Sequence, residues 1–126
     1  MAMNDSAVFG YFLGLLAQVK MHHWCTLSYA KHKALDELHE TLSEKVDLFI
    51  ESWMGRLKKQ PVLKLSVELP ALEGDATAKV DKYIEAERDR VLAMSAKSFA
   101  KAPELQNVLE DIATAMDQSL YLFKLS

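Results

Sequence analysis

The sequence predicts an all-α protein, a four-helix bundle formed by a single domain of residues 1–126. Four segments carry apolar side chains every three or four residues, which is the period of an amphipathic helix. Glycine (4 residues) and proline (3 residues) are scarce, as expected of a chain with few turns. One long connection separates the second segment from the third. With 126 residues the chain can bury a real hydrophobic core.

The first helix is expected from about Asp5 to Trp24. Asn4 or Asp5 can cap its start, because a side-chain oxygen at that position accepts a hydrogen bond from a free backbone N–H group. An apolar stripe runs along this helix and ends at His23, and its other members are Phe9, Phe12, Leu16 and Val19. The stripe predicts that His23 faces the buried side, while His22 is exposed.

The second helix is expected from about Tyr29 to Trp53, with Thr26 or Ser28 as its cap and Gly55 as its stop. It has two faces. The predicted core stripe consists of Leu35, Leu38, Leu42, Val46, Phe49 and Trp53. The polar stripe consists of His32, Asp36, Glu40, Ser43, Asp47 and Glu51.

A long connection follows, from Arg56 to Asp75. The alternation of apolar and polar residues from Leu63 to Leu69 is compatible with a short strand or with an extended segment lying across the bundle. A connection of this length allows two helical hairpins to pack with a crossover instead of a tight turn.

The third helix is expected from about Ala76 to Ser98, with Asp75 as its cap, and the fourth begins near Pro103. Glu87 or Arg88 falls on the inner face of the third helix, and we expect Glu87 to pair with a neighbouring base. The predicted inner faces consist of Val80, Ile84, Val91 and Met94 in the third helix, and Leu105, Val108, Ile112, Met116, Leu120 and Phe123 in the fourth.

The net charge is −3, and residues 1–7 contain an acid and no base. Affinity for nucleic acid comes from clustered Lys and Arg, so strong DNA binding is not expected. A single cysteine, Cys25, excludes an internal disulfide and fits a reducing cytoplasm. The apolar stretch Val8 to Val19 has no cationic region before it and is too short to cross a bilayer. We therefore predict a cytoplasmic protein without a membrane segment.

Five residues form a candidate metal-ligand set: His23, His32, Asp36, Asp47 and Glu51. From His32 onward their spacings are four, eleven and four residues. An α-helix turns about 100° per residue, so Asp36 and Asp47 lie almost on one line along the helix. Imidazoles and carboxylates on one stripe are ligands for divalent iron, manganese or zinc. The alternative interpretation is a solvated helix face, since surface helices often carry these residue types.

The pair His23-Trp24, followed by His32-x-x-x-Asp36 and Asp47-x-x-x-Glu51, resembles Dps, the ferritin-like DNA-binding protein from starved cells. The likeness covers most of the chain. The chain resembles small, uncharacterised ferritin-like proteins of phages and marine microbes more closely still. It implies a ferritin-like four-helix bundle that binds iron and oxidises it with peroxide or oxygen. By this resemblance the centre lies between two subunits, with His23, His32 and Asp36 from one and Asp47 and Glu51 from the other.

The leading hypothesis is therefore a Dps-like iron-binding protein, with ferroxidase turnover left open. The alternative is a metal-free dimeric bundle that serves as an interaction or structural module. Both need a homodimer or a larger homo-oligomer, because Trp24, Trp53 and Tyr29 add more apolar surface than one core can cover. An intra-subunit di-iron site is not expected, because the third and fourth predicted helices contain no histidine.

Overall fold

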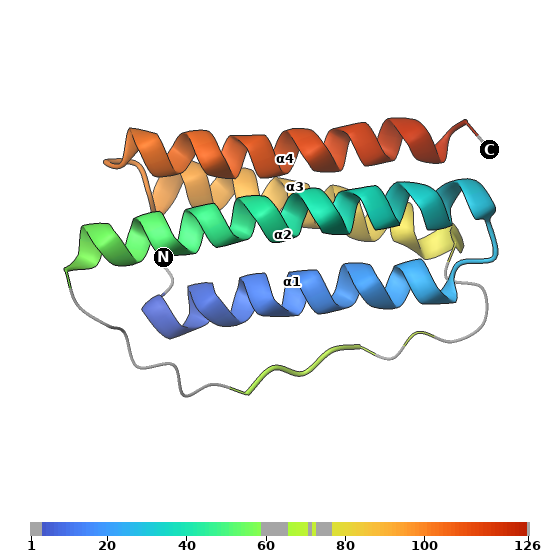
Figure 1. The fold of residues 1–126 in the computed structure, drawn as a ribbon, viewed down its shortest axis with the longest axis horizontal. Helices are drawn as coiled ribbons and strands as arrows, with labels where there is room; N and C mark the ends of the chain where they lie inside the picture. The colour runs from blue at the N-terminus through green and yellow to red at the C-terminus, as the bar shows by residue number, and fades with distance from the viewer. Residues whose placement is uncertain (1–3, 59–65, 71, 73–76, 126) are drawn as a thin grey trace.

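The computed structural model describes residues 4–58, 66–70, 72 and 77–125. They form four helices, shown in Figure 1: α1 (Asp5–Cys25), α2 (Tyr29–Leu57), α3 (Thr77–Lys97) and α4 (Pro103–Phe123). None of the described residues belongs to a strand. Residues 66–69 are extended without forming one, and the rest of the alternating segment, 63–65, lies outside the described residues. The all-α prediction is confirmed.

Side chains at the helix starts account for two of the boundaries. Asn4 Oδ1 accepts a hydrogen bond from Ala7 N at 2.8 Å, which caps α1. Ser28 Oγ accepts one from Lys31 N at 3.2 Å and caps α2. The expected stop at Gly55 is wrong: α2 continues to Leu57 and ends where Lys58 adopts a left-handed conformation with φ of 58°. The proposed cap of α3, Asp75, lies outside the described residues.

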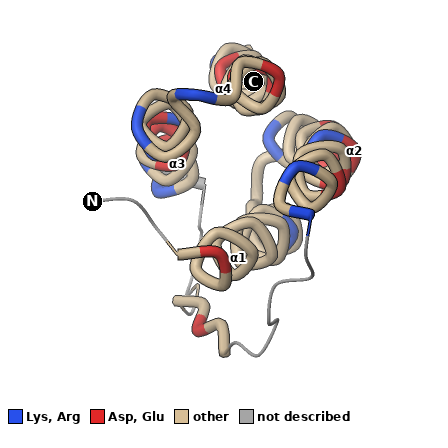
Figure 2. The backbone as a smooth tube through the Cα atoms, turned by 90° about the vertical axis from the view of Figure 1, so that its left-hand side faces the viewer, with Lys and Arg blue, Asp and Glu red and all other residues tan. Residues whose placement is uncertain are grey.

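The helices are arranged as two antiparallel hairpins, α1–α2 and α3–α4 (Figure 1). Helix α2 ends at one end of the bundle and α3 begins at the other, so the connection between them spans its length and the two helices run in the same direction. In the end view of Figure 2 the four helices stand at the corners of a quadrilateral, with α1 beside α2 and α4 opposite α1. One long crossover is the connectivity of ferritin-like bundles.

The core contains the α2 and α3 stripes expected from the sequence. It contains only part of the expected α4 stripe, because Val108 and Leu120 are half-buried while Leu109 is buried. All six residues of the α2 core stripe and all four of the α3 inner face are buried. Rings from α1, α2 and the α3–α4 turn meet at one end: Phe9 lies 5.0 Å from Trp53, Phe12 lies 5.2 Å from Phe49, and Phe49 lies 5.1 Å from Phe99, between ring centroids. Such offset aromatic pairs add stability beyond the area that they bury.

Helix α1 packs closely against α2 but makes few close contacts with α3. Residues 66–70 run beside α1 (Figure 1). Their approach depends on Gly14, because a Cβ atom there would lie 3.2 Å from Val67 Cγ1. The bundle therefore has one loose seam, between α1 and α3, and residues 66–70 lie next to it.

Candidate functional site

The end of α1 and the start of α2 are joined by a reciprocal pair of hydrogen bonds between His23 and His32, here called the histidine clasp. His23 Nδ1 lies 2.8 Å from the carbonyl oxygen of His32, and His32 Nδ1 lies 2.8 Å from the carbonyl oxygen of His23. A carbonyl oxygen only accepts, so each Nδ1 carries the hydrogen and each Nε2 is left as a lone-pair donor or protonation site. The two rings stack with centroids 3.9 Å apart.

The structure corrects the predicted orientation of α1. His22, and not His23, occupies the buried position: His22 is 2% exposed and His23 is only half-buried. The buried residues of α1 repeat at spacings of four, three, four and three through Val8, Phe12, Leu15, Val19 and His22. Phe9, Phe12 and Val19 are buried as predicted, but Leu16 and His23 are only half-buried. Leu15 and His22 take the buried positions instead, because α1 carries apolar residues around much of its circumference.

The three predicted carboxylates lie on the surface of α2. Asp36 follows His32 by one turn, its side chain is 64% exposed, and its Oδ1 lies 3.8 Å from Lys20 Nζ. Asp47 and Glu51 are exposed as well. Among the described residues of this single chain, no three His, Cys, Asp or Glu side chains are close enough to hold a metal ion. Of the five predicted ligands, the structure brings His23 and His32 together within one chain. None of the three acids joins these histidines in a group that could hold a metal ion.

His39 adds a further imidazole near this group. It is half-buried, where exposure was expected. Burial lowers the pKa of His39, and Lys20 and His23 lower it further, while Asp36 acts in the opposite direction. These influences indicate that His39 lies near the same charged groups.

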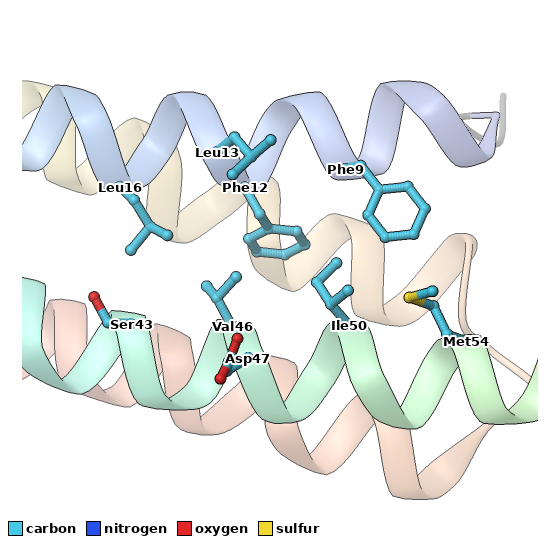
Figure 3. Close-up of a pocket in the computed structure, with 9 residues that line it drawn as sticks. All are labelled: Phe9, Phe12, Leu13, Leu16, Ser43, Val46, Asp47, Ile50 and Met54. Carbon is cyan, nitrogen blue, oxygen red and sulfur yellow. The ribbon is translucent and has the colours of Figure 1, made fainter. Parts of the chain in front are cut away.

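An apolar hollow of about 700 Å³ lies between α1 and α2, toward the α1 start (Figure 3). Asp47 and Ser43 contribute its polar groups. Its other walls are apolar side chains, namely Phe9, Phe12, Leu13, Leu16, Val46, Ile50 and Met54. This hollow was not foreseen, because periodicity predicts which face is apolar and not whether a neighbour fills it.

Large apolar side chains protrude at the α1–α2 turn. Trp24 is 71% exposed, Leu27 80% and Tyr29 74%. Trp53, in contrast, is buried in the aromatic core. Of the two tryptophans expected to be core or interface anchors, one lies in the core and the other is free at the surface of the single chain.

Polar side chains lie along the α1–α3 seam, and sequence reasoning found only one of them in advance. Glu87 is 5% exposed and pairs with Arg90, as expected, while burial raises the pKa of Glu87 against the opposing effect of Arg90. Gln18 and His22 are also buried, and burial lowers the pKa of His22. A signal was present in the sequence: Gln18 and His22 lie one turn apart among apolar residues.

These features define an all-α bundle with one long crossover, a histidine clasp at the α1–α2 turn and an uncovered apolar face. Comparison with known proteins then assigns the family: residues 23–123 match the family of unknown function DUF5856, and the chain belongs to it. It is also similar to the uncharacterised 14.6 kDa protein in the mobD-ri intergenic region of Enterobacteria phage T4. The two are 31% identical over 120 residues, which span 90% of this chain and 86% of the phage protein.

No solved structure gives a significant match to this protein. Among the helices of the described residues, none is long and apolar enough to cross a membrane.

Proposed function

We propose that the protein associates with a second copy of itself through the outer face of α1 and α2, here called the α1–α2 face. Leu13 and Trp24 are eleven residues apart, so they lie almost on one line along α1. Tyr29 and Asp47 are eighteen residues apart, about five whole turns, and share one line along α2. The contact between Lys20 and Asp36 joins the middle of the two lines.

The observation that carries this proposal is the self-complementary shape of the α1–α2 face. Its turn end bears the protruding Trp24 and Tyr29, and its other end holds the apolar hollow. In a two-fold dimer the same patch is used by both copies, and each element of one meets its complement on the other. An antiparallel pair therefore seats the aromatic end of each copy in the hollow of the other. Exposed aromatic and apolar patches are typical of such interfaces.

Iron binding at the same interface is the second function that we propose, in line with the resemblance to Dps. It is favoured by the His23–His32 clasp, because an Nδ1–H group donated to a carbonyl oxygen is the usual support of a histidine that ligates metal through Nε2. The antiparallel dimer would bring the turn end of one copy, with these histidines, to the hollow of the other, where Asp47 lies.

Ferrous iron would be the substrate of that site. Histidine and carboxylate together suit both ferrous and ferric iron. Asp36 would have to exchange its contact with Lys20 for the metal. A reducing cytoplasm, where Cys25 stays unpaired, would supply the ferrous form. Without iron, the same dimer is the metal-free interaction module.

Analytical ultracentrifugation tests the dimer. We expect the wild-type protein to sediment as a dimer at micromolar concentration and Leu13→Asp to sediment as a monomer with unchanged helix content, because it places a charge in the hollow. Leu92→Asp is the matched control: Leu92 is an exposed leucine on α3, away from the α1–α2 face. A monomeric wild-type protein, or dimerisation unaffected by Leu13→Asp, would contradict the proposal.

Anaerobic titration with ferrous iron tests the metal site. We expect His32→Ala, Asp36→Ala and Asp47→Ala each to abolish or strongly weaken binding, and Glu85→Ala, an exposed acid on α3, to leave it unchanged. Mixing His32→Ala with Asp47→Ala should restore one intact site per mixed dimer. A dimer that takes up no iron would leave the interaction module as the function.

A further inference from the structure

A second pocket, separate from the α1–α2 face, lies at the α1–α3 seam. It encloses about 260 Å³ between α1, α3 and residues 67–70. Tyr11, Gln18, Tyr83 and Glu87 are among the residues that line it. Gly10 and Gly14 make room for it, because neither has a side chain on the α1 wall.

A buried hydrogen-bond acceptor in this pocket has no partner in the described part of the chain. Gln18 is 3% exposed, and its Oε1 has no hydrogen-bond partner among the described residues. Buried side-chain oxygens are nearly always paired, and leaving one unpaired costs about 1–3 kcal/mol. His22 Nδ1, one turn further along α1, also has no hydrogen-bond partner among the described residues. An amide oxygen can only accept a hydrogen bond, so a donor belongs beside Gln18 Oε1.

The charges around the pocket favour a positively charged donor. Glu87 is buried in its wall and Glu68 lies at its edge, whereas Arg90 is the only base among the described residues that line it. Arg90 Nη1 lies 3.1 Å and 3.4 Å from the two Glu87 oxygens, and the Arg90 side chain is otherwise mostly exposed. One half-solvated partner leaves the carboxylate with free lone pairs. Burying a carboxylate is costly unless cations and hydrogen bonds compensate for it.

We propose that this pocket binds a small aliphatic primary ammonium compound. Its ammonium group donates hydrogen bonds to Gln18 Oε1 and to the Glu87 carboxylate, and its methylene groups contact Leu15, Leu69 and the tyrosine rings. Ligand pockets commonly enclose about 300–1,000 Å³, so a volume below that range selects a molecule of only a few heavy atoms.

A divalent metal ion fits the same pocket less well. Hard cations such as Ca²⁺ take about six to eight oxygen ligands, usually with several carboxylates. Within the described ranges, no three acidic, histidine or cysteine side chains lie close enough together to hold a metal ion. The apolar walls also have no role in metal binding, whereas they suit the aliphatic part of an amine.

Titration of ¹⁵N-labelled protein with n-butylammonium chloride near neutral pH tests the proposal, with 1-butanol as the uncharged probe. At that pH an alkylamine is fully protonated, since amine groups of this type have pKa values near 10.4. We expect saturable shifts of backbone amides in 10–18 and 83–90 with the ammonium salt and not with the alcohol. Glu87→Gln and Gln18→Met should each weaken binding at least tenfold, and Glu85→Gln should not.

Three outcomes would overturn the proposal: no saturable shifts, an equal response to 1-butanol, or shifts produced by magnesium chloride and not by the ammonium salt. The wild-type titration decides even where one variant fails to fold. Leu13→Asp, which tests the dimer, leaves this pocket intact, so the two proposals fail independently.

Discussion

Two adjacent histidines on α1 have opposite environments. His22 is enclosed between α1 and α3, with its ring 5.0 Å from that of Tyr83. His23, turned by about 100°, instead meets His32 across the α1–α2 turn. The first is a buried neutral base whose protonation opposes folding. The second is a clasp between two helices, with Nε2 available for chemistry.

The buried state of His22 predicts a loss of stability in mild acid. Burial lowers the pKa of His22 in the folded chain, while the unfolded chain keeps the ordinary value near 6.5. Stability is therefore complete above about pH 6.5 and is lost as the pH falls toward the folded-state pKa, by at most about 1.4 kcal/mol per pH unit. Urea unfolding at several pH values should show this loss.

The matched variant is His22→Phe, which keeps an aromatic ring against Tyr83 and cannot titrate. Subtracting its pH profile from that of the wild type removes the contribution of Glu87, whose raised pKa acts in the opposite sense. Parallel profiles for the two proteins would show that His22 is not the responsible group.

At the scale of elements, α2 is the longest helix, with 29 residues, and it contributes both a core stripe and the polar stripe that holds the candidate ligands. It continues through Gly55 although glycine weakens a helix interior. The left-handed residue that ends it is Lys58, so Gly55 does not act as the stop. The side-chain caps at Asn4 and Ser28 fix where α1 and α2 begin.

Gly55→Ala should stabilise the protein by about 0.5–1 kcal/mol, because alanine restricts the unfolded chain and favours the helix. The position is exposed, and a Cβ there would meet nothing within 4 Å. Gly14→Ala is the informative comparison, because the added Cβ would lie 3.2 Å from Val67 Cγ1. This close contact should reduce or cancel the gain in stability. Thermal unfolding followed by circular dichroism measures both. A destabilised Gly55→Ala protein would disprove the helical assignment at Gly55.

At the scale of the whole molecule, α1 is covered unevenly. Its inner side packs on α2 and the core, its α3 side leaves a polar pocket, and its outer side is an apolar surface. A single chain therefore leaves aromatic groups in water that a second copy can cover. Both proposed functions depend on this self-association, and iron uptake by the dimer distinguishes between them.

Self-association predicts that thermal stability depends on protein concentration. A dimer is stabilised by mass action, so the unfolding temperature should rise on concentrating the protein from micromolar to hundreds of micromolar. In Leu13→Asp the unfolding temperature should no longer change with concentration. Calorimetry at three concentrations checks both. A wild-type unfolding temperature that does not change with concentration would argue for a monomer.

Duplex DNA should bind weakly at physiological salt. The chain has 18 acidic and 15 basic residues, and acids and bases alternate over the surfaces of the helices (Figure 2). Few phosphates can be neutralised at once, and electrostatic affinity rises with the number of such contacts, so it should be low here. A gel-shift titration at low and at physiological salt tests this. Tight, salt-sensitive retardation would contradict the prediction.

Several parts of the structure followed from the sequence by itself. Four amphipathic segments gave the four helices with boundaries within about four residues, and the α2 stripe identified its buried side chains correctly from Leu35 to Trp53. Such predictions succeed because a helix with one polar face has only one orientation that buries its apolar side chains. The caps followed from local hydrogen bonding, which needs no distant partner.

Only the tertiary structure decided the orientation of α1 and the environment of the candidate ligands. Apolar residues surround much of α1, so its sequence did not determine whether His22 or His23 would be buried; the positions of α2 and α3 did. The spacing from His32 to Glu51 placed the candidate ligands on one stripe, yet among the described residues of one chain they do not come close enough to hold a metal ion. Local periodicity fixes which residues share a face, whereas the packing of neighbouring elements fixes what covers that face.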